Sequence, residues 1–376
     1  MQTIFGYLEQ HKREMKETLI RLVEAESPSR NKLLSDRCGQ VLADLFEELV
    51  GGQIEKIEKE SVGNQYRFSI GSGQEQILII GHYDTVWDQA AIPLHEEDGI
   101  LYGPGVFDMK GGLTVTLWAL KALKSTGVDL NKKIVFLVTS DEEIGSLHSR
   151  ALIEEEARKS ELVLVPESSI SNSGAVKTFR KGIGIFKIEV TGTAVHAGIN
   201  PWEGVSAIDE LVLQLQEIKK LDNREAGISI NIGTISGGTR TNVVADHAEA
   251  MIDVRFTTKA QGQMLDAAIR SCLSFIPRAV IDITGNINRY PMEETKEVLT
   301  LFSELKEIAA GHGYVLQNGG SGGASDGNFT ATLGIPTIDG LGPMGDGAHA
   351  VNEHVLLKNL PYRAALIAEL LERKLT

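Results

Sequence analysis

Cysteine is scarce in this chain, which holds only Cys38 and Cys272 among its 376 residues. Two cysteines exclude a disulfide framework and a cysteine-rich zinc site, so a reducing cytoplasm is the simplest compartment to expect. No apolar run approaches the roughly 18 residues of a membrane-spanning helix. The N-terminal segment also lacks a basic stretch followed by an apolar one, so no signal peptide is expected. We therefore expect no membrane partner.

Positive charge is also in short supply. Lysine and arginine number 37 against 51 aspartates and glutamates, which gives a net charge of −14. A chain this acidic is a poor candidate for binding nucleic acid or an anionic membrane. The hydrophobic content of 42% and the charged content of 23% are ordinary for a globular protein. The length favours two or three domains.

Up to about residue 180, strand-like and helix-like segments alternate. One helix is expected from Phe5 to Val23 and ends before Pro28, because proline disfavours helix at the residue before it. Further helices are expected at 35–49 and 113–123. Short apolar runs predict buried strands at 66–70, 76–80, 134–139 and 162–165. This alternation is typical of an α/β domain with a largely parallel sheet.

After residue 180 the pattern changes to half-exposed antiparallel strands. Strands are expected at 184–190, 228–235, 248–256 and 279–284, with helices at 205–221 and from Thr258. Thr258 and Gln261 have the spacing of a capping box. The α/β pattern then returns. We therefore expect a discontinuous domain of residues 1–178 and 288–376 with a second, α+β domain at 179–287.

Two segments place acids or histidine beside a predicted strand or helix. His82 and Asp84 follow the strand at 76–80, and period two puts both side chains on one face. Asp84 can then orient His82 as a metal ligand. The segment GPGVFDMKGG at 103–112 surrounds Asp108 with glycine and proline just before a helix. A dinucleotide fingerprint would need glycine where Asp108 stands, so a metal site fits better.

Further acids and a histidine follow other predicted strands. Glu142 and Glu143 come after the strand at 134–139, Glu167 after that at 162–165, and His349 after a later strand and a glycine-rich loop. Alone, each would read as a solvated turn residue. The carboxyl ends of parallel strands meet at one sheet edge, where ligand sites lie. Two histidines with three carboxylates are the ligand set of a two-metal hydrolytic site.

With the motifs GHYDTV, GPGVFDMKGG, DEEIGS and GDGAHAVNE in this order, the chain resembles the M20 family of co-catalytic zinc metallopeptidases. Within it the chain is most similar to the glutamate carboxypeptidase branch. The resemblance covers nearly the whole chain. It implies a phosphorylase/hydrolase-like α/β catalytic domain with a mixed, largely parallel sheet, and an inserted α+β, ferredoxin-like lid or dimerisation domain.

The resemblance also implies roles for individual residues and a cofactor of two Zn²⁺, replaceable by Co²⁺ or Mn²⁺. Glu142 would be the general base, and Asp84 would support His82. A cis peptide is expected between Asp108 and Met109. Asp108 would bridge both metals, His82 and His349 would bind one each, and each metal would be completed by one of two glutamates. The implied metal ligands are His82, Asp108, Glu143, Glu167 and His349.

In the inserted domain, the resemblance implies three substrate contacts. His196 would reach the active site of a partner subunit and stabilise the oxyanion of the intermediate. Asn242 would be a second contact, and Arg289 would grip a substrate carboxylate, which suits the fork of its guanidinium. A surface salt bridge is the competing interpretation for Arg289. These roles imply a homodimer formed through the inserted domain.

The expected function is a carboxypeptidase that releases a C-terminal amino acid, with glutamate as a candidate, from a small peptide or N-acyl conjugate. An N-acyl-amino-acid deacylase of the aminoacylase or deacetylase type shares the same chemistry and is the first alternative. A non-catalytic metal-dependent binding protein is the second, and Asp84 with Glu142 argues against it because a binder needs no general base. A nucleotide-binding oxidoreductase is more remote.

Overall fold

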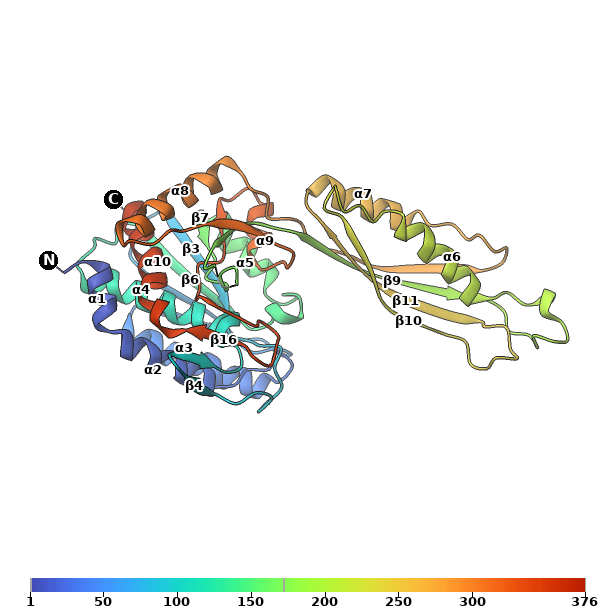
Figure 1. The fold of residues 1–376 in the computed structure, drawn as a ribbon, viewed down its shortest axis with the longest axis horizontal. Coiled ribbons are helices and arrows are strands. Elements are labelled where there is room, and N and C mark those ends of the chain that lie inside the picture. The colour runs from blue at the N-terminus through green and yellow to red at the C-terminus, as the bar shows by residue number, and fades with distance from the viewer. Residues whose placement is uncertain (1, 172, 376) are drawn as a thin grey trace. The chain divides into compact units, whose positions relative to one another are not determined.

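The computed structural model describes residues 2–171 and 173–375, which form two compact units (Figure 1). The first unit holds the described residues up to Phe179, then Glu294–Ser321 and those from Ser325 onward. The second unit holds Arg180–Glu293 and residues 322–324. Its last strand ends at Arg289, and beyond it Met292 and Arg180 exchange backbone hydrogen bonds in an isolated bridge.

A six-stranded sheet forms the centre of the first unit. Three of its five strand pairings are parallel, those of β3 with β6, β3 with β7 and β7 with β14. The sheet is therefore mixed and largely parallel, as expected. Apolar runs at 66–70, 76–80, 134–139 and 162–165 are confirmed as strands. In spatial order the strands are β1 (Gln53–Ile57), β2 (Gln65–Ile70), β6 (Lys133–Thr139), β3 (Gln76–His82), β7 (Ser160–Leu164) and β14 (Thr337–Ile338).

Helices cover both faces of this sheet. Along β3, Ile77 and Ile79 pack into one apolar cluster, whereas Leu78 and Ile80 pack into another, because successive strand side chains point to opposite faces. The first cluster includes residues of α1 (Ile4–Gln10), α2 (Lys12–Glu24), α3 (Lys32–Leu49), α4 (Gly111–Ser125), α8 (Lys296–Gly311) and α10 (Leu360–Leu375). The second includes residues of α5 (Arg150–Arg158) and α9 (Gly327–Thr332).

One sequence expectation is wrong here. The helix expected from Phe5 to Val23 is two helices, α1 and α2, which meet at His11. The backbone of His11 leaves the helical region at φ −106° and ψ 19°. Its ring Nδ1 lies 2.8 Å from the carbonyl oxygen of Tyr7. The apolar spacing continues across this break, so the pattern alone does not reveal it.

Two small sheets complete the first unit. One pairs β8 (Val176–Arg180) with β13 (Asn318–Ser321). The other is antiparallel and joins chain segments far apart in sequence. Its strands, in order, are β15 (Gly345–Asp346), β16 (His354–Leu356), β5 (Ile100–Tyr102) and β4 (His95–Glu97).

The second unit is an antiparallel sheet with two helices packed on one face (Figure 1). Its chain order is β9 (Gly182–Thr191), α6 (Ala207–Lys219), β10 (Ser229–Gly237), β11 (His247–Phe256), α7 (Lys259–Arg270) and β12 (Val280–Arg289). The spatial order β10-β11-β9-β12 is the ferredoxin-like arrangement that was expected. The capping box of Thr258 and Gln261 is present. Across the described residues of both units, no helix combines the length and apolarity needed to cross a membrane.

Candidate metal centre

His82 stands at the carboxyl end of β3 and is buried. Its Nδ1 atom lies 3.0 Å from the backbone oxygen of Asp84 and 3.4 Å from the Oδ1 atom of the same residue. Nε2 points the other way, 3.4 Å from Oδ1 of Asp108 and 3.2 Å from Oε1 of Glu167. Burial alone would lower the pKa of His82, but the carboxylates of Asp108, Asp84 and Glu167 outweigh it and raise the pKa well above its usual value.

Asp108 lies in a five-residue turn, Val106–Lys110, directly before α4, and the backbone angles of Asp108 and Met109 are not helical. Gly105 begins this turn at φ 72°, a left-handed conformation that glycine adopts without a steric penalty. The peptide bond between Asp108 and Met109 is cis, as the family resemblance implied. The side chain of Asp108 is 17% exposed. Burial would raise its pKa, but His82 and His349 lower the pKa below its ordinary value.

Glu142 and Glu143 begin a short 3₁₀ turn, Glu142–Ile144, that follows β6. They therefore do not alternate as strand residues would. The Oε2 atom of Glu143 lies 3.2 Å from Nε2 of His349. Burial raises the pKa of Glu143 to about 7, although His349 opposes this shift. Glu142 is half-buried beside it.

His349 occupies a loop between β15 and β16 and has a left-handed backbone, with φ 62°. Its Nε2 atom also lies 3.6 Å from Oδ2 of Asp108. The side chain is 53% exposed. The hydrogen bond with Glu143 raises the pKa of His349 to about 9, against the opposing effect of partial burial.

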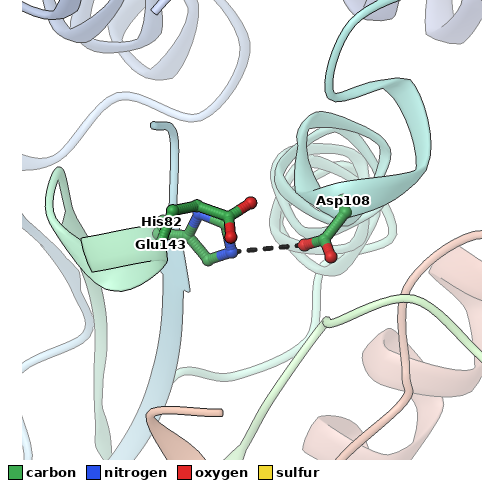
Figure 2. Close-up of side chains that lie close together, drawn as sticks. All are labelled: His82, Asp108 and Glu143. Carbon is green, nitrogen blue, oxygen red and sulfur yellow. Dashed lines mark ion pairs between the residues drawn. The ribbon is translucent and has the colours of Figure 1, made fainter. Parts of the chain in front are cut away.

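Asp108 thus lies between two pairs of residues. Its Oδ1 faces His82, which contacts Glu167, and its Oδ2 faces His349, which contacts Glu143. Figure 2 shows His82, Asp108 and Glu143 converging from separate elements. Ligand atoms of these three residues all lie within 4.8 Å of one another.

The donor set fits a divalent metal. Nε2 of His82 and Oε1 of Glu143 are buried and have no hydrogen-bond partner of good geometry within the described residues. Leaving buried polar atoms unsatisfied costs roughly 1–3 kcal/mol each, and a bound cation would satisfy both. Imidazole and carboxylate are ligands of Zn²⁺, and carboxylate also suits Mn²⁺.

Asp84 holds neighbouring parts of the same centre in place through hydrogen bonds. It is fully buried, and its carboxylate accepts hydrogen bonds from the hydroxyl of Ser29 at 2.7 Å and from the amides of Glu142 and Glu143 at 3.3 and 3.2 Å. The expected link to His82 therefore extends further than the sequence indicates. One carboxylate orients a histidine and the turn that carries both glutamates.

Sequence reasoning missed Glu353. This residue is buried, and its carboxylate accepts a hydrogen bond from the backbone amide of Asp108 at 3.0 Å. Its position inside the segment GDGAHAVNE, four residues after His349, is the signal that could have identified it. Glu167, which follows Pro166, lies beside His82 as expected.

The remaining predicted site residues belong to the second unit. His196 and Asn242 are exposed neighbours, since the amide of Ala197 donates to the backbone oxygen of Asn242 at 2.9 Å. Arg289 is buried at the end of β12, where it pairs with Ile183. His196 follows the opposite end of β9. The rise of a strand, ~3.3 Å per residue, separates these two ends by roughly 26 Å.

Another group of possible metal ligands lies on the second unit, but its charges are already balanced without a metal ion. Glu189, His247 and Glu249 lie close together on neighbouring strands. Lys187 already sits between the two carboxylates, 2.8 Å from Glu189 and 2.7 Å from Glu249. The lysine supplies the positive charge that a cation would bring.

Comparison with known proteins identifies the family. The profile of Peptidase family M20/M25/M40 matches residues 78–373, which is most of the chain and includes the residues of the centre. The chain belongs to this M20 family. Family M20 consists of metal-dependent hydrolases of the peptidase and amidohydrolase type, in agreement with the donor set of the centre.

The M20 relatives similar to this chain are named for different hydrolytic activities. The chain is 30% identical to carboxypeptidase G2 of Pseudomonas sp. (strain RS-16) over 80% of its own length and 74% of that protein. It is 28% identical to the succinyl-diaminopimelate desuccinylase of Hydrogenovibrio crunogenus over 92% of its length and 96% of that protein. The structure of aminopeptidase PepT from Bacillus cereus has the same fold, with a TM-score of 0.79, 23% identity and coverage of 96% and 98%.

Proposed function

We propose that this M20 hydrolase is a carboxypeptidase that releases a C-terminal amino acid, with glutamate as the first candidate, from a small peptide or an N-acyl conjugate. The observation that carries the proposal is the position of Asp108 between His82 and His349, each of which contacts a further carboxylate. The relative named carboxypeptidase G2 supports the choice of reaction.

Two Zn²⁺ are the proposed cofactor, with Co²⁺ or Mn²⁺ as replacements. His82 and Glu167 would hold one ion, His349 and Glu143 the other, and Asp108 both. Metal ions at such a site lower the pKa of bound water toward 7 and polarise the carbonyl that is attacked. Without them, burial raises the pKa of Glu143 and the hydrogen bond to Glu143 raises the pKa of His349, so both residues favour their protonated forms in the metal-free protein.

Glu142 is the proposed general base. It takes a proton as water attacks the amide carbonyl and returns that proton to the leaving amine, a task that contributes roughly 10²–10⁴ in rate. Its backbone amide donates to Asp84 at 3.3 Å, and its neighbour Glu143 contacts His349. The turn that carries Glu142 is thereby held from two sides.

The second unit would supply the substrate contacts. Arg289 would pair with the carboxylate of the released amino acid, while His196 and Asn242 would stabilise the oxyanion of the tetrahedral intermediate. Arg289 and His196 lie at opposite ends of β9, roughly 26 Å apart along the strand. Both can therefore contact one small substrate only if they come from different copies of the chain. This separation supports a homodimer.

The second unit also offers a surface on which a second copy could pack. β10 is an edge strand of the sheet, and unpaired edges readily pair with another chain. Ile235 on β10 is 58% exposed, and Ile208 and Val212 on α6 are 38% and 41% exposed. Such apolar exposure beside a free edge favours a partner there.

An N-acyl-amino-acid deacylase is the second candidate. The desuccinylase relatives, which the chain matches over about nine tenths of its length, favour it. The reaction is the same amide hydrolysis with another acyl group.

A cytoplasmic location completes the proposal, since Cys38 and Cys272 are both free thiols.

A substrate screen on zinc-reconstituted protein tests the proposal. Peptidyl- and N-acyl-glutamates, succinyl- and acetyl-amino acids, and neutral dipeptides are compared by kcat/KM, with chelator-treated protein as the control. A glutamate conjugate that turns over fastest supports the carboxypeptidase. Faster turnover of acyl-amino acids replaces it with the deacylase. Full turnover after chelation, or none with zinc bound, contradicts the proposal.

A further inference from the structure

Glu353 is a buried acid to which the proposed reaction gives no role. It is 1% exposed, and its carboxylate accepts four hydrogen bonds. Oε2 accepts at 2.6 and 3.1 Å and Oε1 at 2.9 and 3.0 Å. The four N–H donors are, in the same order, the indole of Trp87 and the backbone amides of Gly105, Phe107 and Asp108.

These donors occupy the whole acceptor capacity of the group. An ionised carboxylate offers about four lone-pair sites and no proton, so it can accept all four bonds. Three of the donors are amides at the start of the turn that carries Asp108. The first amides of a helical turn have no partner within the turn, and here a distant side chain satisfies them.

The backbone of Glu353 is itself fixed in place. The next residue, His354, begins β16, which pairs with β5 on one side and β15 on the other. The backbone oxygen of Glu353 also accepts from the amide of Gly103 at 3.3 Å. Glu353 thus stands at the base of the loop that carries His349. It connects that loop to the turn of Asp108.

We propose that Glu353 is a positioning residue of the metal centre, which sets the place of Asp108 relative to His349 and so allows one carboxylate to serve two ions. Its carboxylate is occupied by four N–H donors, so it acts through the turn that it holds. The inference rests on the proposed two-metal site, not on the identity of the substrate.

The test is the isosteric variant Glu353→Gln in the full-length chain. The glutamine amide has the same shape but only one acceptor oxygen. Its NH₂ group would face N–H donors, from which it cannot accept a hydrogen bond. Zn²⁺ affinity is measured by competition with a chromophoric chelator, and the visible absorption bands of Co²⁺-loaded protein report the ligand geometry. Changing a group that orients a metal ligand typically costs 10–100-fold in metal affinity, and we expect a loss in that range with shifted Co²⁺ bands.

Glu156→Gln is the matched control. Glu156 is as deeply buried as Glu353. It forms ion pairs with Lys159 at 2.8 Å and Arg67 at 3.0 Å. It also accepts from Gln76, at the opposite end of β3 from His82. Its substitution should lower the melting temperature of the metal-free protein without changing Zn²⁺ affinity or the Co²⁺ spectrum.

The outcomes separate positioning from general stability. Zn²⁺ affinity and Co²⁺ bands in E353Q that match those of E156Q would overturn the proposal. If E353Q does not fold, Trp87→Phe removes one of the four donors. It should then shift the Co²⁺ bands and weaken Zn²⁺ binding by about tenfold or less, at the low end of that range, and an unchanged spectrum would count against the inference. Because Zn²⁺ and Co²⁺ alone are the probes, failure to find a substrate leaves this result intact.

Discussion

The Nε2 atom of His349 lies 3.2 Å from the Oε2 atom of Glu143, and each residue alters the protonation of the other. Glu143 raises the pKa of His349 to about 9. Burial raises the pKa of Glu143 to about 7, with His349 acting against that shift. The metal-free centre therefore holds protons at neutral pH that metal ions must displace.

Metal binding should release protons. At pH 7 His349, with a pKa of about 9, is protonated in the metal-free protein, and Glu143, with a pKa of about 7, is about half protonated. Metal ligands bind in deprotonated form, so these two residues should together release between one and two protons. The raised pKa of His349 also stabilises the metal-free folded protein. This stabilisation is complete below about pH 6.5, the pKa of histidine in the unfolded chain, and is lost as the pH rises through about 9. Zn²⁺ affinity should thus increase with pH. Calorimetry in buffers of different ionisation enthalpy measures this, and a release near zero would contradict it.

The two adjacent glutamates should separate catalysis from metal binding. Glu142→Gln should lower kcat by about 10²–10⁴, because the general base is lost, and should leave the bound metal in place. Glu143→Gln should weaken the binding of one ion at least tenfold, because a ligand charge is lost. Metal analysis and steady-state kinetics on both variants check this. Equal metal loss in the two variants would remove the distinction.

Asp84 should act on the turn of the glutamates as well as on His82. Asp84→Asn would place an amide NH₂ against the N–H groups of Glu142 and Glu143 or against Ser29. We expect kcat to fall about 10–100-fold, in the range found for groups that orient metal ligands. Ser29→Ala removes only one donor and should have a smaller effect. Kinetics at saturating zinc measure both, and an Asp84→Asn variant with normal kcat would contradict the role.

Mixing two inactive variants tests whether His196 acts across a dimer. In mixed dimers of His196→Ala and Glu142→Gln, one of the two sites combines an intact Glu142 with an intact His196 from the other copy. Random mixing should restore about a quarter of the wild-type activity, because half the dimers are mixed and each has one intact site. Activity measured before and after subunit exchange decides the matter. If His196 serves its own chain, mixing restores nothing.

Much of the architecture could be predicted because it depends on local patterns. Strands buried on both faces are apolar along their middle, as 77–80 of β3 and 134–138 of β6 are, and such runs are visible in sequence. The strands of the inserted unit were also predicted, since apolar and polar residues alternate along half-exposed strands. The break at His11 escaped prediction because it leaves the apolar spacing intact. Helix α5 and the short strands of the small sheets carry too few residues to form a pattern.

The candidate site divides in the same way. The sequence by itself placed His82, Asp108, Glu142, Glu143, Glu167 and His349 after predicted strands or loops at one edge of a parallel sheet, and the family resemblance assigned the roles among them. Only the tertiary structure decided that Asp108 turns one oxygen toward each histidine and that Glu353 caps its turn. The contacts of Asp108 with His349 and Glu353 join segments more than 200 residues apart, where long-range packing rather than local sequence fixes the distances.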